Sequence, residues 1–133
     1  MNGVRLALIT CVLVAAAWTT AAASAAPLSE GQAKACLHSH GFSVANRPDL
    51  GAASVSANDW FVATRGAVHV NVAYFANVLG ATYARAVLGA LTKSTAKALG
   101  TTVTGLRQNG RVVYWWSVSS TRYSPVVQAC LGR

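Results

Sequence analysis

Apolar residues alternate with polar or small ones in two stretches of the chain, and each stretch has a turn signal near its centre. The first covers 59–74 around the Arg-Gly dipeptide 65–66, and the second covers 101–118 around the Asn-Gly dipeptide 109–110. A period of two is typical of a β-strand, and a two-residue turn that contains glycine is typical of a hairpin. The pattern therefore predicts two β-hairpins.

The first hairpin separates its residues onto two different faces. With the turn at 65–66, Thr64 lies opposite Ala67 and Val62 lies opposite His69. We expect the uniformly apolar face to pack on the core, and its residues are Phe61, Ala63, Val68, Val70 and Val72. The other face is mixed and carries Trp60, Val62, Thr64, His69 and Asn71. In the second hairpin both faces are apolar, so the pattern does not select the buried one.

Spacings of three and four residues predict helices on either side of the first hairpin. Ser29 is a good N-cap and Gln32 completes a capping box, so we expect a short helix that ends just before Gly41. Asn77 can cap a long helix that runs to about Leu99. The predicted apolar stripe of the long helix consists of Leu79, Tyr83, Ala86, Val87, Ala90 and Leu91.

A last short helix is predicted over 126–131, after Pro125, so the order of elements is α-ββ-α-ββ-α. This order predicts an α+β fold with a four-stranded, mainly antiparallel sheet made from the two hairpins. The long helix crosses one face of the sheet, which places the two hairpin turns at opposite ends. Residues 43–58 are rich in serine and contain proline and glycine, so we expect a loop, with a short strand over 42–44 as the alternative.

Residues 1–25 have the three parts of an export signal. Arg5 gives a positive start, an apolar run covers 6–18, and the sequence Ala-Ser-Ala at 23–25 matches the A-x-A cleavage pattern. We predict cleavage after residue 25, which leaves a single secreted domain over 26–133. The alternative is an uncleaved anchor, because about 20 apolar residues are enough to span a bilayer.

Cleavage also changes the cysteine count. It removes Cys11 and leaves Cys36 and Cys130 near the two ends of the mature chain. Two cysteines in an oxidising compartment allow a single intramolecular pairing, so we predict a Cys36–Cys130 disulfide that links the terminal helices. The alanine-rich composition, with arginine favoured over lysine, indicates a bacterial source. The expected location is therefore the periplasm, the cell envelope or the medium.

Charge narrows the range of partners. Loss of Arg5 leaves ten of the 11 lysines and arginines against three acidic residues, and a basic balance favours anionic partners. We expect an anionic envelope polymer or another exported protein as the partner, no nucleic acid, and no stable membrane span after cleavage. The predicted topology brings together one basic cluster, Arg65 with Lys93 and Lys97, because the long helix returns towards the Arg65 end of the sheet.

The candidate ligand surface combines this basic cluster with the mixed face of the first hairpin. Its residues are Trp60, His69, Asn71, Arg65, Lys93 and Lys97. An uncovered face with aromatic, polar and titratable side chains is a plausible shallow binding site. The alternative is that a helix covers this face and that His69 is a hydrogen-bonded core residue.

No motif for catalysis, a cofactor or a metal occurs in the sequence. His38 and His40 are two residues apart and point in different directions on a helix, so we expect no metal there. Without a nucleophile elbow or paired carboxylates, we expect a non-catalytic binding or interaction module. The alternatives are a small extracellular hydrolase that uses His69, and a structural component of an envelope assembly, which would expose an apolar patch of several hundred Å².

Overall fold

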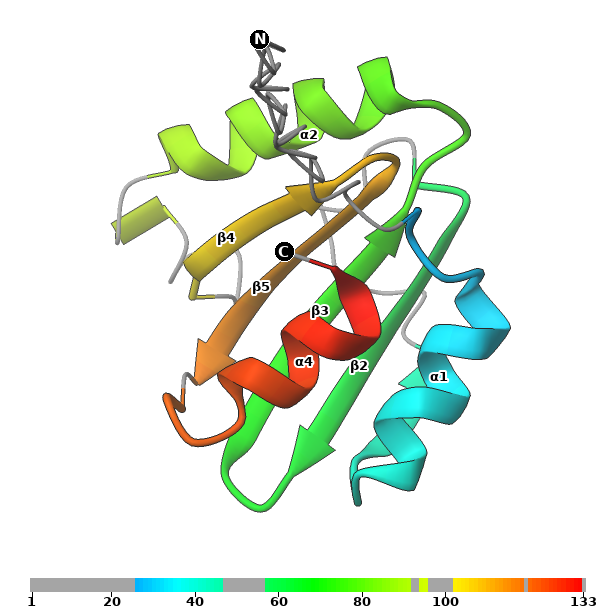
Figure 1. Cartoon of the computed structure of the whole chain (residues 1–133). Coiled ribbons are helices and arrows are strands. Elements are labelled where there is room, and N and C mark those ends of the chain that lie inside the picture. The colour runs from blue at the N-terminus through cyan, green and yellow to red at the C-terminus, as the bar shows by residue number, and fades with distance from the viewer. Residues whose placement is uncertain (1–25, 47–56, 92–93, 96–101, 119, 133) are drawn as a thin grey trace, which may run out of the picture.

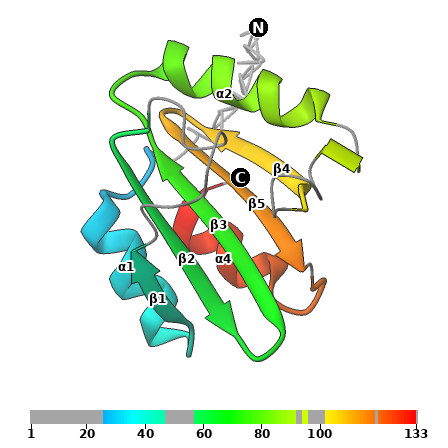
Figure 2. The ribbon, with the colours of Figure 1, turned by 180° about the vertical axis from the view of Figure 1, so that it is seen from behind.

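The computed structural model describes residues 26–46, 57–91, 94–95, 102–118 and 120–132. They form an α+β fold in which a five-stranded antiparallel sheet lies between two layers of helices (Figure 1). The strands are β1 (Ser43–Asn46), β2 (Asp59–Arg65), β3 (Val68–Tyr74), β4 (Thr104–Asn109) and β5 (Val112–Val118). The helices are α1 (Glu30–Ser39), α2 (Val78–Ala90) and α4 (Ser124–Leu131). The strand order is β1-β2-β3-β5-β4, and α1 and α4 lie behind the sheet in Figure 2.

The fifth strand corrects the prediction of a four-stranded sheet. Residues 43–46 form the edge strand β1, which pairs antiparallel with β2 from Ser43 opposite Thr64 to Asn46 opposite Phe61. Three of the four β1 side chains are exposed, so this strand has no alternation of buried and exposed positions. Val44 is the one β1 side chain that packs against the core, so the hydrophobic pattern gave only a weak signal, and the alternative of a short strand over 42–44 is the part of the prediction that comes close. The rest of the predicted loop, residues 47–56, lies outside the described residues.

Both hairpins form, but each turn lies one residue later than predicted. Arg65 pairs with Val68 and Asn109 pairs with Val112, so the turn residues are 66–67 and 110–111. Each turn then has glycine at its first central position, with φ of 58° at Gly66 and 56° at Gly110. Hairpin turns need a positive φ at that position, which glycine adopts without steric cost. Moving the turn by one residue displaces the partner of each β2 residue by two positions, for example from Ala67 to His69 opposite Thr64. Residues two apart lie on the same face of a strand, so the predicted division of β2 and β3 into two faces is confirmed.

The two terminal helices cover one face of the sheet. The predicted core residues of the first hairpin pack there with alternate residues of β5 and with Leu37 of α1 and Val127 of α4. The disulfide joins these helices through Cys36 and Cys130, whose Cα atoms are 5.6 Å apart across a sequence separation of 94. The predicted link between the terminal helices is therefore present.

Helix α2 covers the opposite face, but with a different stripe from the predicted one. Asn77 caps it as expected, since its side chain accepts a hydrogen bond from the Gly80 amide. The buried residues of α2 are Ala81, Ala84 and Leu88, which pack with Trp60 and Trp115. Of the predicted stripe only Leu91 packs against this cluster. The rest of the stripe is wrong because the sheet already carries two indole rings at this place, and small alanines let the helix backbone approach them.

The described helix is also shorter than predicted. It ends at Ala90, because Leu91 has φ −65° and ψ 126° and so leaves the helical region. Gly89 in the last turn weakens the helix there, since glycine loses the most backbone freedom on folding. The predicted continuation towards Leu99 falls largely on residues 92–93 and 96–101, which lie outside the described residues.

Candidate functional site

The mixed face of the first hairpin carries His69 and Asn71 of the candidate ligand surface. His69 is half-buried, and its Nδ1 atom lies 3.5 Å from Thr64 Oγ1. Asn71 is only 2% exposed and donates a hydrogen bond of 2.6 Å to Ser117 Oγ. Histidine and asparagine are therefore tied to neighbouring hydroxyl groups within the sheet. No carboxylate is shown beside His69 in the part of the chain that the structure describes.

The tryptophans of this face belong to the core. Trp60 and Trp115 are 6% and 0% exposed, and their rings meet edge to face with centroids 5.5 Å apart. Trp116 packs in the core on the opposite face. The indole N–H groups of Trp60 and Trp115 are buried, and neither has a hydrogen-bond partner among the described residues. An aromatic platform for stacking needs exposed ring faces, which these burial values exclude for Trp60 and Trp115.

Arg65 does not lie with His69. It shares the face of Val68, and its guanidinium donates to the carbonyl of His40 at the end of α1, with an Nη1–O distance of 2.6 Å. It also lies over the ring of Tyr123, 4.7 Å from the centroid. These contacts fasten the β2–β3 turn to α1 and to the segment before α4. Lys93 and Lys97, the other members of the predicted basic cluster, lie outside the described residues.

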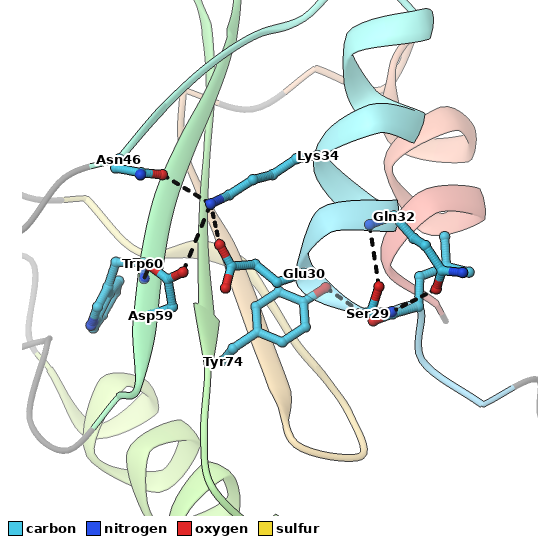
Figure 3. Close-up of polar contacts among 9 residues, drawn as sticks. Ser29, Glu30, Gln32, Lys34, Asn46, Asp59, Trp60 and Tyr74 are labelled. Atoms are coloured by element: carbon cyan, nitrogen blue, oxygen red, sulfur yellow. Dashed lines mark hydrogen bonds and ion pairs between the residues drawn. The ribbon is translucent and has the colours of Figure 1, made fainter.

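At the other end of the sheet, Lys34 and the two acidic residues Glu30 and Asp59 form a charged cluster (Figure 3). It was not predicted from the sequence. Lys34 Nζ bonds to the carboxylate of Glu30 one helical turn earlier, lies 3.8 Å from Asp59 Oδ2, and donates to Asn46 Oδ1 at 2.9 Å. Glu30 and Lys34 have the i,i+4 spacing of a helix-surface ion pair, so this part of the cluster could have been predicted from the sequence. Asp59 joins only because the fold brings the start of β2 against α1.

The two carboxyl groups of this cluster influence each other. A hydrogen bond with Asp59, followed by partial burial, raises the pKa of Glu30 above its usual 4.5. The same hydrogen bond lowers the pKa of Asp59 below 3.8, helped by the backbone amide of Trp60 and by Lys34. Tyr74 lies near Glu30, and burial raises the pKa of its hydroxyl to about 12. Glycosidase carboxyls are separated by roughly 5–10 Å, so a directly bonded pair does not match that geometry.

A shallow groove adjoins the cluster, between α1 and β1. It has a volume of about 560 Å³, and its lining includes Lys34, His38, Val44 and Asn46. The side chain of Asn46 at its rim is already engaged by Lys34. The groove is wide and open, so it gives a ligand little enclosure.

His40 and the disulfide form the one possible metal-ligand group among the described residues. One ring nitrogen of His40 and the two sulfur atoms of Cys36 and Cys130 lie within 4.8 Å of one another. The sulfur atoms are bonded to each other, and metals bind thiolates. In the disulfide state this group therefore offers a single imidazole. His38, the other residue of the predicted pair, lines the groove between α1 and β1 instead.

The side of α2 that points away from the sheet carries exposed apolar side chains. Leu79 is 80% exposed and Tyr83 is 67% exposed, Val87 continues their side of the helix, and Val78 is exposed on the flank at the first residue of α2. We call these four residues the outward face of α2. Residues 79, 83 and 87 follow each other at intervals of four, so they form a row along the helix. The row lies roughly opposite the buried alanines, and helix α2 is therefore apolar on both sides.

Other proteins offer no guide to this surface. Comparison of the chain with family models, with curated proteins and with solved structures finds no match. Among the described residues, no helix is both long enough and apolar enough to cross a membrane.

Proposed function

We propose that the chain is exported from a bacterial cell and acts there as a non-catalytic interaction module of the cell envelope, meeting its partner through the outward face of α2. The observation that carries this proposal is the exposure of Leu79 and Tyr83 on a helix whose opposite side is already packed. Taking about 150–250 Å² for a large side chain, the four residues expose on the order of 400 Å² of largely apolar surface. Patches of this size on a small domain often mark interaction sites.

Two further features support a module that works outside the cytoplasm. The Cys36–Cys130 bridge is of the kind that persists in oxidising compartments. The N-terminal segment 1–25 has the pattern of an export signal. The disulfide and Arg65 both fix the terminal helices, so the sheet offers α2 a rigid support.

A hydrolase that uses His69 has less support. Such an enzyme needs a nucleophile, a base and an orienting group in contact. The described neighbours give His69 the hydroxyl of Thr64 at 3.5 Å, while Glu30 and Asp59 are both held by Lys34 at the other end of β2 and β3. The orienting carboxylate of a triad is therefore missing from the described surroundings of His69.

The proposal is tested by binding to envelope preparations of the producing cell. The purified protein and its Leu79→Ser/Tyr83→Ser variant are incubated with the preparation, and the fraction that sediments with it is measured. We expect the variant to lose at least about fivefold in bound fraction, because two apolar contacts are removed. Val118→Ser is the matched control, since Val118 is 47% exposed but lies on β5. Equal sedimentation of all three proteins, or none by the wild type, would overturn the proposal.

A further inference from the structure

We infer that the outward face of α2 rests on an anionic lipid surface, with Leu79 and Tyr83 entering the headgroup region. This inference rests on the proposed function and names its partner. An interfacial helix buries one apolar side among lipid headgroups, and its attachment grows with apolar area and with positive charge. Four observations favour lipid over the other occupants of such a face: its area, its charge, its position in the molecule, and the place where the chain enters the fold.

The area is too small for a stable pair of identical chains. Two copies joined through this face would bury roughly 800 Å² in all, whereas stable protein interfaces bury about 1,200–2,000 Å². A lipid surface sets no such lower limit, because each side chain that enters it contributes separately. Tyr83 suits this environment, since tyrosine places its ring among the headgroups and keeps its hydroxyl in contact with water.

The charge of the molecule is complementary to anionic lipid. Helix α2 contains no acidic residue, and its one charged residue, Arg85, is exposed. The described acidic residues, Glu30 and Asp59, are both in contact with Lys34, so little free negative charge opposes the approach. After loss of residues 1–25 the chain has ten lysines and arginines against three acidic residues, a formal charge of +7. Basic residues near a membrane are drawn to its anionic lipids over a distance of about one Debye length.

The position of α2 lets a flat surface reach it. Figures 1 and 2 show α2 along one margin of the molecule, with the sheet, α1 and α4 all on the same side of it. Because Ala81, Ala84 and Leu88 face the sheet, the row that contains Leu79 and Tyr83 faces away from the rest of the described fold. A bilayer can therefore contact the whole row at once.

The chain also enters the fold at the end where α2 begins. A Cβ atom built on Gly110 would lie 3.3 Å from Pro27 Cγ, so Pro27 packs on the β4–β5 turn. The next turn residue, Arg111, accepts a hydrogen bond from the Phe75 amide, three residues before α2. The described chain therefore begins at the end of the sheet from which α2 starts, and export through a membrane under the proposed function brings this end close to lipid.

The test is sedimentation with vesicles of pure phosphatidylcholine and of phosphatidylcholine mixed with phosphatidylglycerol. It uses the protein as the exporting cell delivers it, with Leu79→Ser/Tyr83→Ser and Val118→Ser as the variant and its control. We expect binding to the mixed vesicles that weakens with added salt, a loss of about tenfold or more in the double variant, and no change in the control. Near-ultraviolet circular dichroism confirms that the variants keep the native fold.

Five results would overturn the inference. Equal binding to both kinds of vesicle removes the role of charge, and equal binding by the double variant removes the role of α2. A dimer in solution that the double variant disperses, without vesicle binding, identifies a second copy as the occupant. Binding to envelope preparations without binding to vesicles identifies an envelope protein or polymer, and the proposed function then survives the failure of the lipid inference. If neither preparation binds the protein, both fail.

Discussion

The orientation of α2 decides the functional argument, and a pair of identical substitutions tests it. Leu88→Ala and Leu79→Ala remove the same atoms from the same helix. Leu88 is 3% exposed and packs with the tryptophan cluster, whereas Leu79 is 80% exposed. Truncation of a buried leucine costs about 2–5 kcal/mol, because apolar contacts are lost and a cavity remains. Its neighbours Ala81 and Ala84 cannot fill the space, so we expect about 3 kcal/mol for Leu88→Ala.

The expected cost for Leu79→Ala is within about 0.5 kcal/mol, since the side chain is mostly in water and alanine is the better helix former. Equilibrium unfolding in urea measures both values, with tryptophan fluorescence as the signal because Trp60 and Trp115 lie in the cluster that Leu88 contacts. In heat unfolding, Leu88→Ala should lower Tm by at least about 10 °C. If Leu79→Ala costs as much as Leu88→Ala, Leu79 is packed in the protein as Leu88 is, and both proposals about the outward face lose their basis.

Three further outcomes are expected. Replacing Cys36 and Cys130 together by alanine should lower the free energy of unfolding by about 4–5 kcal/mol in the chain-entropy model, because the bridge closes a loop of 94 positions; a loss below about 1 kcal/mol in urea unfolding would contradict this. Gly132→Ala should cost at least about 2 kcal/mol by the same assay, since Gly132 has φ 91° and a Cβ atom there would overlap a buried asparagine amide; a neutral variant would refute the geometry. The contribution of Glu30 to stability should fall as pH rises above 4.5, because the unfolded chain releases the Glu30 proton there while the folded chain, with its raised pKa, still keeps it. Glu30→Gln should flatten the dependence of stability on pH just above 4.5, and an unchanged slope in urea unfolding would contradict the raised pKa of Glu30.

Local signals in the sequence predicted most of the elements correctly. The capping box of Ser29 and Gln32 and the cap at Asn77 are both present in the structure. The two turns were found but misplaced by one residue, because glycine was assigned to the second turn position. Gly66 and Gly110 occupy the first, and the neighbouring arginine or asparagine pairs within the strand. A turn dipeptide thus fixes where a hairpin bends only to within one residue.

Features that depend on contacts between distant segments were not predictable from these patterns. β1 is held by its backbone pairing with β2 and by Val44, which packs against the core, and a single apolar side chain gives too little pattern to predict a strand. Asp59 meets Glu30 and Lys34 only after α1 has packed on the sheet. The described residues of the candidate ligand surface are not brought together on one face. Arg65 and His69 are neighbours at the end of one hairpin, but they lie on opposite faces of the sheet.

The prediction for α2 failed in a way that bears on function. The row predicted from the sequence has the largest apolar side chains and contains Leu79, Tyr83 and Val87. The row that packs on the sheet contains Ala81 and Leu88 and has smaller side chains on average. A helix that serves only to cover a sheet needs one apolar side, and water favours polar residues on the other. The larger apolar row is therefore not explained by the packing of this fold. An external apolar surface accounts for both rows at once, with the alanines fitted to the sheet and the large side chains left for the partner.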